Sequence, residues 1–282
     1  MARNSALFVM FLLVLSACAS GPQGPYDRGV EQYEIGHVGK SISDYKQAIA
    51  LRPDDPLPRF NLAVIYQDEG RLAEAEKLYR EIVKGHPGFS PAWANLASIM
   101  EKRGRAGKAE KLYLRAMKAD GGSCASSSQY GFFLLRQGRG EEAERIFTKS
   151  LKNDARCANG WFGLGLIAEK KGDTRAALRD FDRDSIYNPA DIEAYVRSAD
   201  ILLTLGDTRR AAGLLEKAEK LDPKNGALNL KLGRVLLTNG ELKKAEEALE
   251  RAKKNGAPPA ECERELSRVY RKLSVQAADA AR

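Results

Sequence analysis

PLPRFNLAVIYQDEGRLAEAEKLYREIVKGHPGF, residues 56–89, is the stretch that shows how this chain is built. Its fifteenth residue is Gly70, and glycines recur every 34 residues on either side of it. They are Gly36, Gly70, Gly104, Gly138, Gly172, Gly206 and Gly240. Because the spacing is constant, the chain divides without insertion or deletion into seven units of 34 residues. The units are 22–55, 56–89, 90–123, 124–157, 158–191, 192–225 and 226–259.

Other positions of the unit repeat together with this glycine. Position 8 holds only glycine or alanine, and position 20 holds alanine in every unit except the first, which has Ser41. Position 24 holds Tyr45, Tyr79, Tyr113, Phe147, Phe181, Leu215 and Leu249. Position 32 is proline in four units, as Pro53, Pro87, Pro189 and Pro223.

These columns predict two helices in each unit. Glycine at position 15 ends the first helix because it adopts the left-handed conformation without a steric penalty. Proline at position 32 follows the second helix because it cannot continue the hydrogen-bond ladder. Small residues at positions 8 and 20 let the two helices approach closely, and the large residue at position 24 fills the space between them.

The pattern resembles the tetratricopeptide repeat (TPR), and the resemblance covers residues 26–259. It implies an all-α fold, a right-handed superhelical solenoid of about seven helix-turn-helix repeats whose stacked units share a core. Pro22, Gly24 and Pro25 predict a short first helix, and the joint at 121–124 lacks the proline and is expected to be looser. Residues 260–275 are expected to form a solvating helix that caps the last repeat, with a partner-binding tail as the alternative.

The first 25 residues have the features of an export signal followed by a lipid anchor. Arg3, the apolar stretch 6–15 and the small residues after it predict a signal peptide over 1–17, too short to span a bilayer. Leu15-Ser16-Ala17-Cys18 resembles the lipobox of bacterial lipoproteins, which implies cleavage before Cys18 and acylation of that residue. An ordinary cleaved signal is the alternative. Residues 18–25 are expected to be a tether.

The residue after Cys18 is Ala19 rather than aspartate. In the lipoproteins of enteric bacteria that this segment resembles, such a residue favours the outer membrane. We therefore expect the protein to be lipid-anchored at the periplasmic face of the bacterial outer membrane.

Composition argues against several functional classes. Of 282 residues, 43% are hydrophobic and 30% are charged, which excludes both a disordered chain and a bundle of membrane spans. The net charge of +8 comes from basic residues interleaved with acidic ones, so we expect no nucleic-acid partner. Two histidines, four scattered cysteines and the lack of a phosphate-binding loop or nucleophile motif predict no catalytic residues, no cofactor and no metal site.

The first helices of TPR arrays line an inner wall on which ligands lie. The resemblance therefore implies a groove that binds an amphipathic or extended segment of another envelope protein. Its expected residues are Phe60, Val64, Phe132, Leu135, Phe162 and Leu166. The alternative is that these side chains belong to the core. Asn61 and Asn95 recur at position 6, but the other residues of a carboxylate-binding clamp are missing, so we expect none.

Cys124 and Cys157 stand at the first and last positions of the fourth unit, so both are expected at the same rim. Export would permit a disulfide between them. However, adjacent helix axes lie ~8–10 Å apart, whereas bridged Cα atoms lie ~4.4–6.8 Å apart, so bridged and unbridged forms both remain open. Cys262 is expected to be a small buried side chain.

These features predict a non-enzymatic scaffold in the bacterial envelope. Within that class the chain resembles the type IV pilus pilotin lipoproteins, most clearly over residues 130–139 (YGFFLLRQGR), and the resemblance implies a role in assembling an outer-membrane secretin. The alternatives are an adaptor for peptidoglycan enzymes or exopolysaccharide export, and a non-catalytic subunit of an enzyme complex.

Overall fold

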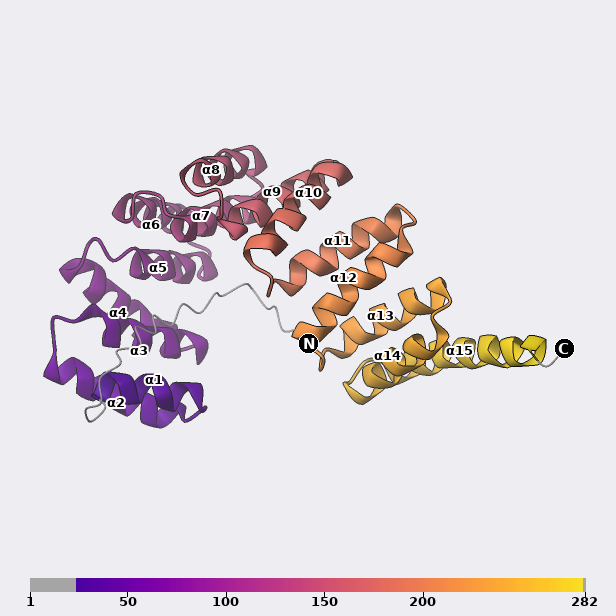
Figure 1. The fold of residues 1–282 in the computed structure, drawn as a ribbon. Helices are drawn as coiled ribbons and strands as arrows, with labels where there is room; N and C mark the ends of the chain where they lie inside the picture. The colour runs from indigo at the N-terminus through magenta and orange to yellow at the C-terminus, as the bar shows by residue number, and fades with distance from the viewer. Residues whose placement is uncertain (1–23, 281–282) are drawn as a thin grey trace. The chain divides into compact units, whose positions relative to one another are not determined.

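The computed structural model describes residues 24–280, which form fifteen helices and, over that range, no strand (Figure 1). The first fourteen helices pair into seven hairpins in the predicted register, and a longer helix follows. The helices are α1 Pro25–Glu34, α2 Val38–Leu51, α3 Pro56–Asp68, α4 Leu72–Gly85, α5 Ser90–Lys102, α6 Ala106–Ala119, α7 Cys124–Arg136, α8 Gly140–Asn153, α9 Ala158–Lys171, α10 Thr174–Tyr187, α11 Ile192–Thr204, α12 Thr208–Leu221, α13 Gly226–Asn239, α14 Leu242–Lys254 and α15 Pro259–Ala280. The predicted all-helical repeat fold is confirmed.

The chain forms two compact units that divide within α7, between Tyr130 and Gly131. The N-terminal unit contains the hairpins α1–α2, α3–α4 and α5–α6, and the C-terminal unit contains α8 to α15. In each unit the helices of a hairpin pack against each other, and the second helix of one hairpin packs against the first helix of the next.

The glycine at position 15 ends the first helix of every repeat, as predicted. All seven of these glycines have φ between 70° and 81°, in the left-handed region. At Gly172 and Gly240 the glycine is itself the residue that caps the helix, and its N–H donates to carbonyl groups in the last turn. A side chain at these positions would be strained, which explains why the column holds no other residue.

Positions 8 and 24 pack against each other in the hairpins whose position 8 is glycine. A Cβ atom built on Gly165 would lie 2.6 Å from the Phe181 ring, and one built on Gly131 would lie 2.6 Å from the Phe147 ring. Both aromatic rings are fully buried. The small residue is therefore required because the ring occupies the space that its side chain would take.

Position 4 closes the joint between consecutive repeats, a role that the sequence pattern did not reveal. The indole Nε1 of Trp93 donates to the carbonyl oxygen of Pro87 at 2.9 Å, and Trp161 donates to Ala155 at the same distance. The hydroxyl of Tyr195 donates to the Pro189 carbonyl at 3.3 Å. Side chains of different chemistry thus donate to the same carbonyl group, that of position 32 in the turn after the second helix.

The joint without proline, before the fourth repeat, is held by Asp120. Its carboxylate accepts hydrogen bonds from the hydroxyls of Ser90 at 2.6 Å, Ser126 at 2.7 Å and Ser123 at 2.8 Å. Burial would raise the pKa of Asp120, but these hydrogen bonds together lower it below its ordinary value. The looser joint expected from the sequence is instead a hydrogen-bonded turn.

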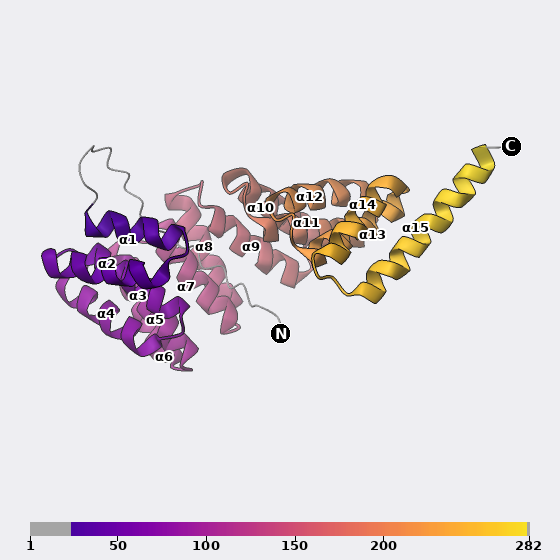
Figure 2. The ribbon, with the colours of Figure 1, turned by 90° about the horizontal axis from the view of Figure 1, so that it is seen from below.

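Helix α15 packs along α14 and covers the last repeat. Cys262, Leu266 and Val269 are buried against the core of the C-terminal unit. The helix continues to Ala280, past the expected end at residue 275, and extends beyond α13 and α14 (Figures 1 and 2). Cys262 is the small buried side chain that was expected, and burial raises the pKa of its thiol.

Candidate partner-binding site

The predicted groove residues of the N-terminal unit differ in accessibility. Phe60 is only 6% exposed, and its ring lies 5.3 Å from the ring of Phe89 and 5.9 Å from that of Tyr79. Val64, one turn further along α3, is partly exposed. Phe60 is therefore a core residue rather than a groove residue, because its side chain fills the gap between α3 and the helices that follow.

Asn61 and Asn95, which recur at position 6, support the tyrosines at position 24. The side-chain amide of Asn61 donates to the hydroxyl of Tyr45 at 3.3 Å, and that of Asn95 donates to the hydroxyl of Tyr79 at 3.0 Å. Burial raises the pKa of Tyr45 to about 12, although the Asn61 amide partly offsets this. Both asparagines are buried, so neither presents its amide to a partner's carboxylate.

In the C-terminal unit, aromatic rings form a connected row from one repeat to the next. The Phe132 ring lies 5.2 Å from Phe147 and 6.3 Å from Phe162, and Phe162 lies 5.5 Å from Phe181. Phe162 is 2% exposed, so a partner cannot reach it without repacking the repeat. The expectation that Phe162 lines a groove is corrected for the same reason as for Phe60: its side chain packs between two repeats.

Phe132, Leu135 and Leu166 remain partly exposed on the first helices α7 and α9. Phe132 and Leu166 pack with one side on the core around Phe162 and Phe181. Val196 and Leu203 on α11 are likewise partly exposed and rest on the adjoining core. We call these five residues the apolar wall. Phe132 and Leu166 stand at position 9 of the repeat, Leu135 and Leu203 at position 12, and Val196 at position 5. Phe162 also stands at position 5 but is buried, so the position in the repeat does not by itself decide whether a side chain is exposed.

Beyond the apolar wall, ion pairs connect the first helices of successive repeats. Glu169 on α9 pairs with Arg197 on α11 at 2.8 Å, and Asp200 on α11 pairs with Lys231 on α13 at 2.7 Å. The same pattern continues between α13 and α15, where Arg234 pairs with Glu261 at 2.6 Å. In the sequence these partners are residues of opposite charge about one repeat apart. The packing of neighbouring first helices brings them together as ion pairs. Because these charges neutralise one another, this surface offers little free charge to a ligand.

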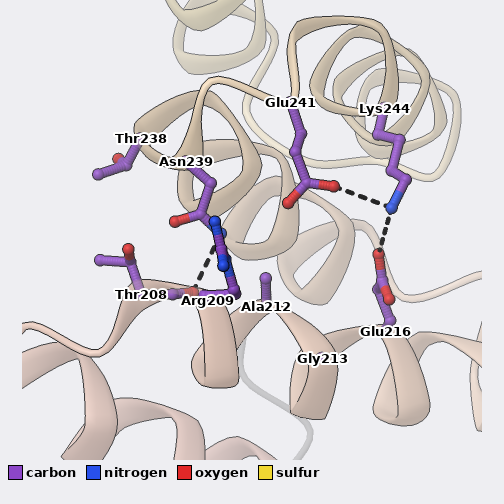
Figure 3. Close-up of a pocket in the computed structure, with 9 residues that line it drawn as sticks. All are labelled: Thr208, Arg209, Ala212, Gly213, Glu216, Thr238, Asn239, Glu241 and Lys244. Atoms are coloured by element: carbon purple, nitrogen blue, oxygen red, sulfur yellow. Dashed lines mark hydrogen bonds and ion pairs between the residues drawn. The ribbon is translucent and has the colours of Figure 1, made fainter.

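The C-terminal unit also has a cavity of about 620 Å³ between α12 and the turn that joins α13 to α14 (Figure 3). Lys244 reaches Glu241 at 2.9 Å and Glu216 at 3.4 Å, and the Asn239 amide donates to the Thr208 carbonyl at 3.2 Å. The other lining residues are Arg209, Ala212, Gly213 and Thr238. Its two cations and two anions balance, and its lining has neither histidine nor cysteine.

The acylation of Cys18 and the disulfide between Cys124 and Cys157 were predicted from the sequence. Cys18 lies outside the described residues, and Cys124 and Cys157 belong to different units, so acylation and the disulfide both stay predictions. Mass measurement without reductant distinguishes the bridged chain from the unbridged one.

Among residues 24–280, no cluster of three or more histidine, cysteine or acidic side chains could hold a metal ion. In the same range, every helix is too short or too polar to cross a bilayer.

Comparison with known families identifies the repeat. Two tetratricopeptide-repeat models match, one over residues 36–99 and 67–126 and the other over 134–190 and 196–259. The chain belongs to the tetratricopeptide repeat family. Proteins of this family are generally non-catalytic scaffolds that bind protein partners and peptides. A comparison with curated protein sequences finds no significant match.

Solved structures share the fold at low sequence identity. A tetratricopeptide repeat protein from Parabacteroides merdae is 20% identical with a TM-score of 0.55, over 87% of this chain and 97% of that one. PilW, described as a widely conserved type IV pilus biogenesis factor, is 20% identical with a TM-score of 0.57, over 71% of this chain and 93% of PilW. Yeast Tom70 is 19% identical with a TM-score of 0.66, over 89% of this chain but only 53% of Tom70. These similarities establish the architecture.

Proposed function

We propose that the protein is a non-enzymatic scaffold, and that the apolar wall of its C-terminal unit binds a segment of another envelope protein. The observation that carries this proposal is the set of partly exposed apolar side chains on successive first helices, Phe132, Leu135, Leu166, Val196 and Leu203. Contiguous exposed apolar surface on a folded protein usually marks an interaction site. The aromatic row beneath it gives the wall a rigid support.

The chemistry of the wall indicates the kind of segment it binds. An amphipathic helix or an extended strand that buries alternate apolar side chains would match leucine, valine and phenylalanine. The neighbouring ion pairs, Glu169–Arg197 and Asp200–Lys231, would be left intact at the edge of such a contact. A free carboxylate would find no unpaired cation in these pairs, which favours an internal segment over a chain terminus.

The proposal includes a lipid anchor on Cys18 at the periplasmic face of the bacterial outer membrane. Its support is the lipobox-like sequence 15–18 followed by Ala19. Several acyl chains together would hold a soluble repeat array at the bilayer, since each buried methylene contributes about 0.8 kcal/mol. Metabolic labelling with a palmitate analogue tests this step. A wild-type chain that takes up no label, like its Cys18→Ser variant, would exclude the anchor.

Within this class we favour a role in type IV pilus secretin assembly. It is supported by the resemblance of residues 130–139 to the pilotin lipoproteins and by the shared fold with the pilus biogenesis factor PilW. Adaptors for peptidoglycan enzymes or exopolysaccharide export, and a non-catalytic subunit of an enzyme complex, use the same kind of wall and are the competing assignments.

Partner capture from detergent-solubilised envelope tests both levels of the proposal. Leu135→Glu places a charge on the apolar wall at a partly exposed site, and we expect it to abolish capture with little change in thermal unfolding. Leu205→Glu makes the same chemical change at a leucine that is 58% exposed at the end of α11, and should retain capture. A secretin among the captured proteins supports the pilus role. Recovery of murein enzymes alone rejects that role and leaves the scaffold assignment standing.

A further inference from the structure

The outward side of α6, in the N-terminal unit, is unusually basic. Its exposed residues are Gly107, Lys108, Lys111, Leu114, Arg115 and Lys118. Arg105, which immediately precedes the helix, is exposed as well. The one acidic residue of the helix, Glu110, is half-buried and accepts a hydrogen bond from the Tyr130 hydroxyl at 2.9 Å. No anion therefore interrupts the cations along the exposed side of α6.

The cations of α6 also lack ionic partners within residues 24–280. Arg115 lies 5.0 Å from the Trp93 ring centre, which is a contact with an aromatic face rather than with an acid. The preceding second helix in the same unit, α4, differs. There Glu74 pairs with Arg71 and Glu76 with Arg80, both at 2.8 Å, so charges of both signs alternate and cancel.

We infer that this α6 basic face, formed by Arg105, Lys108, Lys111, Arg115 and Lys118 around Leu114, binds the anionic headgroups of a phospholipid bilayer. Lys108 and Lys118 are ten residues apart, which places cations along about 15 Å of helix. Each lysine or arginine close to an anionic leaflet raises the affinity about fivefold. Leu114, which is 46% exposed between them, is suited to enter the apolar boundary of the headgroup layer.

The arrangement fits a lipid surface better than an acidic protein. Three of the five cations are lysines, whose ammonium groups on flexible stems suit mobile headgroups rather than a fixed carboxylate geometry. Selective recognition of an acidic peptide uses arginines held in place for bidentate contacts. The α6 basic face has no such support, because none of its five cations is held by a carboxylate of the described chain.

This inference concerns a different surface from the apolar wall and does not depend on partner binding there. The proposed anchor at Cys18 would strengthen it. Five residues, 19–23, lie between Cys18 and Gly24, the first described residue, so a bilayer holding Cys18 lies within about 20 Å of chain from the N-terminal unit. Such a tether would raise the local concentration of headgroups that the α6 basic face meets.

Vesicle co-sedimentation tests the inference with residues 18–282 carrying Cys18→Ser, so that neither an acyl chain nor the apolar stretch 6–15 contributes. The vesicles contain phosphatidylcholine alone or with phosphatidylglycerol. We expect binding only to the phosphatidylglycerol vesicles, weakening with added salt. Neutralising two cations in Lys108→Gln/Lys111→Gln should lower the partition coefficient about 25-fold.

A matched control removes the same charge elsewhere. Lys243 and Lys254 are exposed on α14 of the C-terminal unit, and Lys243→Gln/Lys254→Gln should change binding by less than about twofold. Equal losses in the two double variants would overturn the inference, as would equal binding to both kinds of vesicle. Binding to polyglutamate without binding to phosphatidylglycerol vesicles would assign the face to an acidic chain instead. Leu135→Glu should leave vesicle binding unchanged, which separates this test from that of the apolar wall.

Discussion

The ring of Phe162 lies 5.5 Å from the ring of Phe181, with the two planes inclined by 53°. Phe181 stands at position 24 of the same repeat and is completely buried, and Phe162 is 2% exposed. The contact ties the first helix of this repeat to its second helix, and through Phe132 it continues to the preceding repeat. Phe162 therefore supports the apolar wall from beneath.

We expect Phe162→Ala to destabilise the C-terminal unit by about 3–5 kcal/mol, because truncating a buried aromatic side chain removes its contacts and leaves a cavity. Urea denaturation measures the change. Leu205→Ala, at a leucine that is 58% exposed, serves as the control and should cost less than about 0.5 kcal/mol. If Phe162→Ala leaves stability unchanged and only weakens partner capture, Phe162 is a groove residue after all.

Gly165→Ala should destabilise the protein although alanine is the better helix former. The added Cβ would lie 2.6 Å from the buried Phe181 ring, and relieving that clash should cost about 1–3 kcal/mol. Gly213 lies within helix α12 with nothing inside 4 Å of its added Cβ, so Gly213→Ala should instead stabilise by about 0.5–1 kcal/mol. Thermal unfolding of both variants gives the comparison, and two changes of the same sign would contradict the packing described for positions 8 and 24.

Asp120→Asn should destabilise the N-terminal unit at neutral pH by about 1–3 kcal/mol, because hydrogen bonds from Ser90, Ser123 and Ser126 to a charged acceptor become weaker or are lost. The pKa of Asp120 is lowered in the folded chain, so its contribution is present above the unfolded pKa of 3.8 and is lost as pH falls through the folded value. The difference between wild type and variant should therefore shrink in acid.

Urea denaturation of Asp120→Asn across the acidic range measures this effect. Asp54→Asn, at an exposed aspartate of the turn between α2 and α3, should show no comparable loss. A penalty for Asp120→Asn that stays constant down to the lowest pH would mean that the charge of Asp120 contributes nothing.

Asp184 gives the C-terminal unit the opposite pH dependence. Burial, together with the nearby carboxylate of Asp191, raises its pKa to about 8 in the folded chain. The pKa of Asp184 in the folded chain lies above its unfolded value of 3.8. The stability that the protonated Asp184 carboxyl provides is therefore complete below pH 3.8 and is lost as pH rises through the folded pKa. Wild type should thus lose stability between mildly acidic and mildly alkaline pH.

Asp184→Asn should flatten this dependence and be more stable than wild type at about pH 9, since it cannot become a buried anion. Urea denaturation at about pH 5 and about pH 9 tests both statements. Glu247→Gln, at an exposed glutamate of α14, is the control and should keep the wild-type slope. An unchanged slope in Asp184→Asn would show that another group governs the response.

The number of repeats, their register and the turn in each hairpin were predictable from the sequence alone. These features depend on local backbone chemistry, namely the left-handed glycine at position 15 and the proline at position 32, and on a strict spacing that reproduces the same local structure in each unit. The pairing of Gly165 with Phe181 was predictable for a related reason, since both residues belong to one hairpin of fixed geometry.

Which side chains are accessible was decided by tertiary structure. Phe162 and Leu166 are four residues apart on one helix, yet only Leu166 is partly exposed, because the side chains of the adjacent repeats cover Phe162. In the same way, Asp200 and Lys231 become partners only when α11 and α13 lie side by side. Accessibility and charge pairing depend on what a neighbouring repeat brings to each side chain, and that information is absent from the periodicity that specifies the repeat itself.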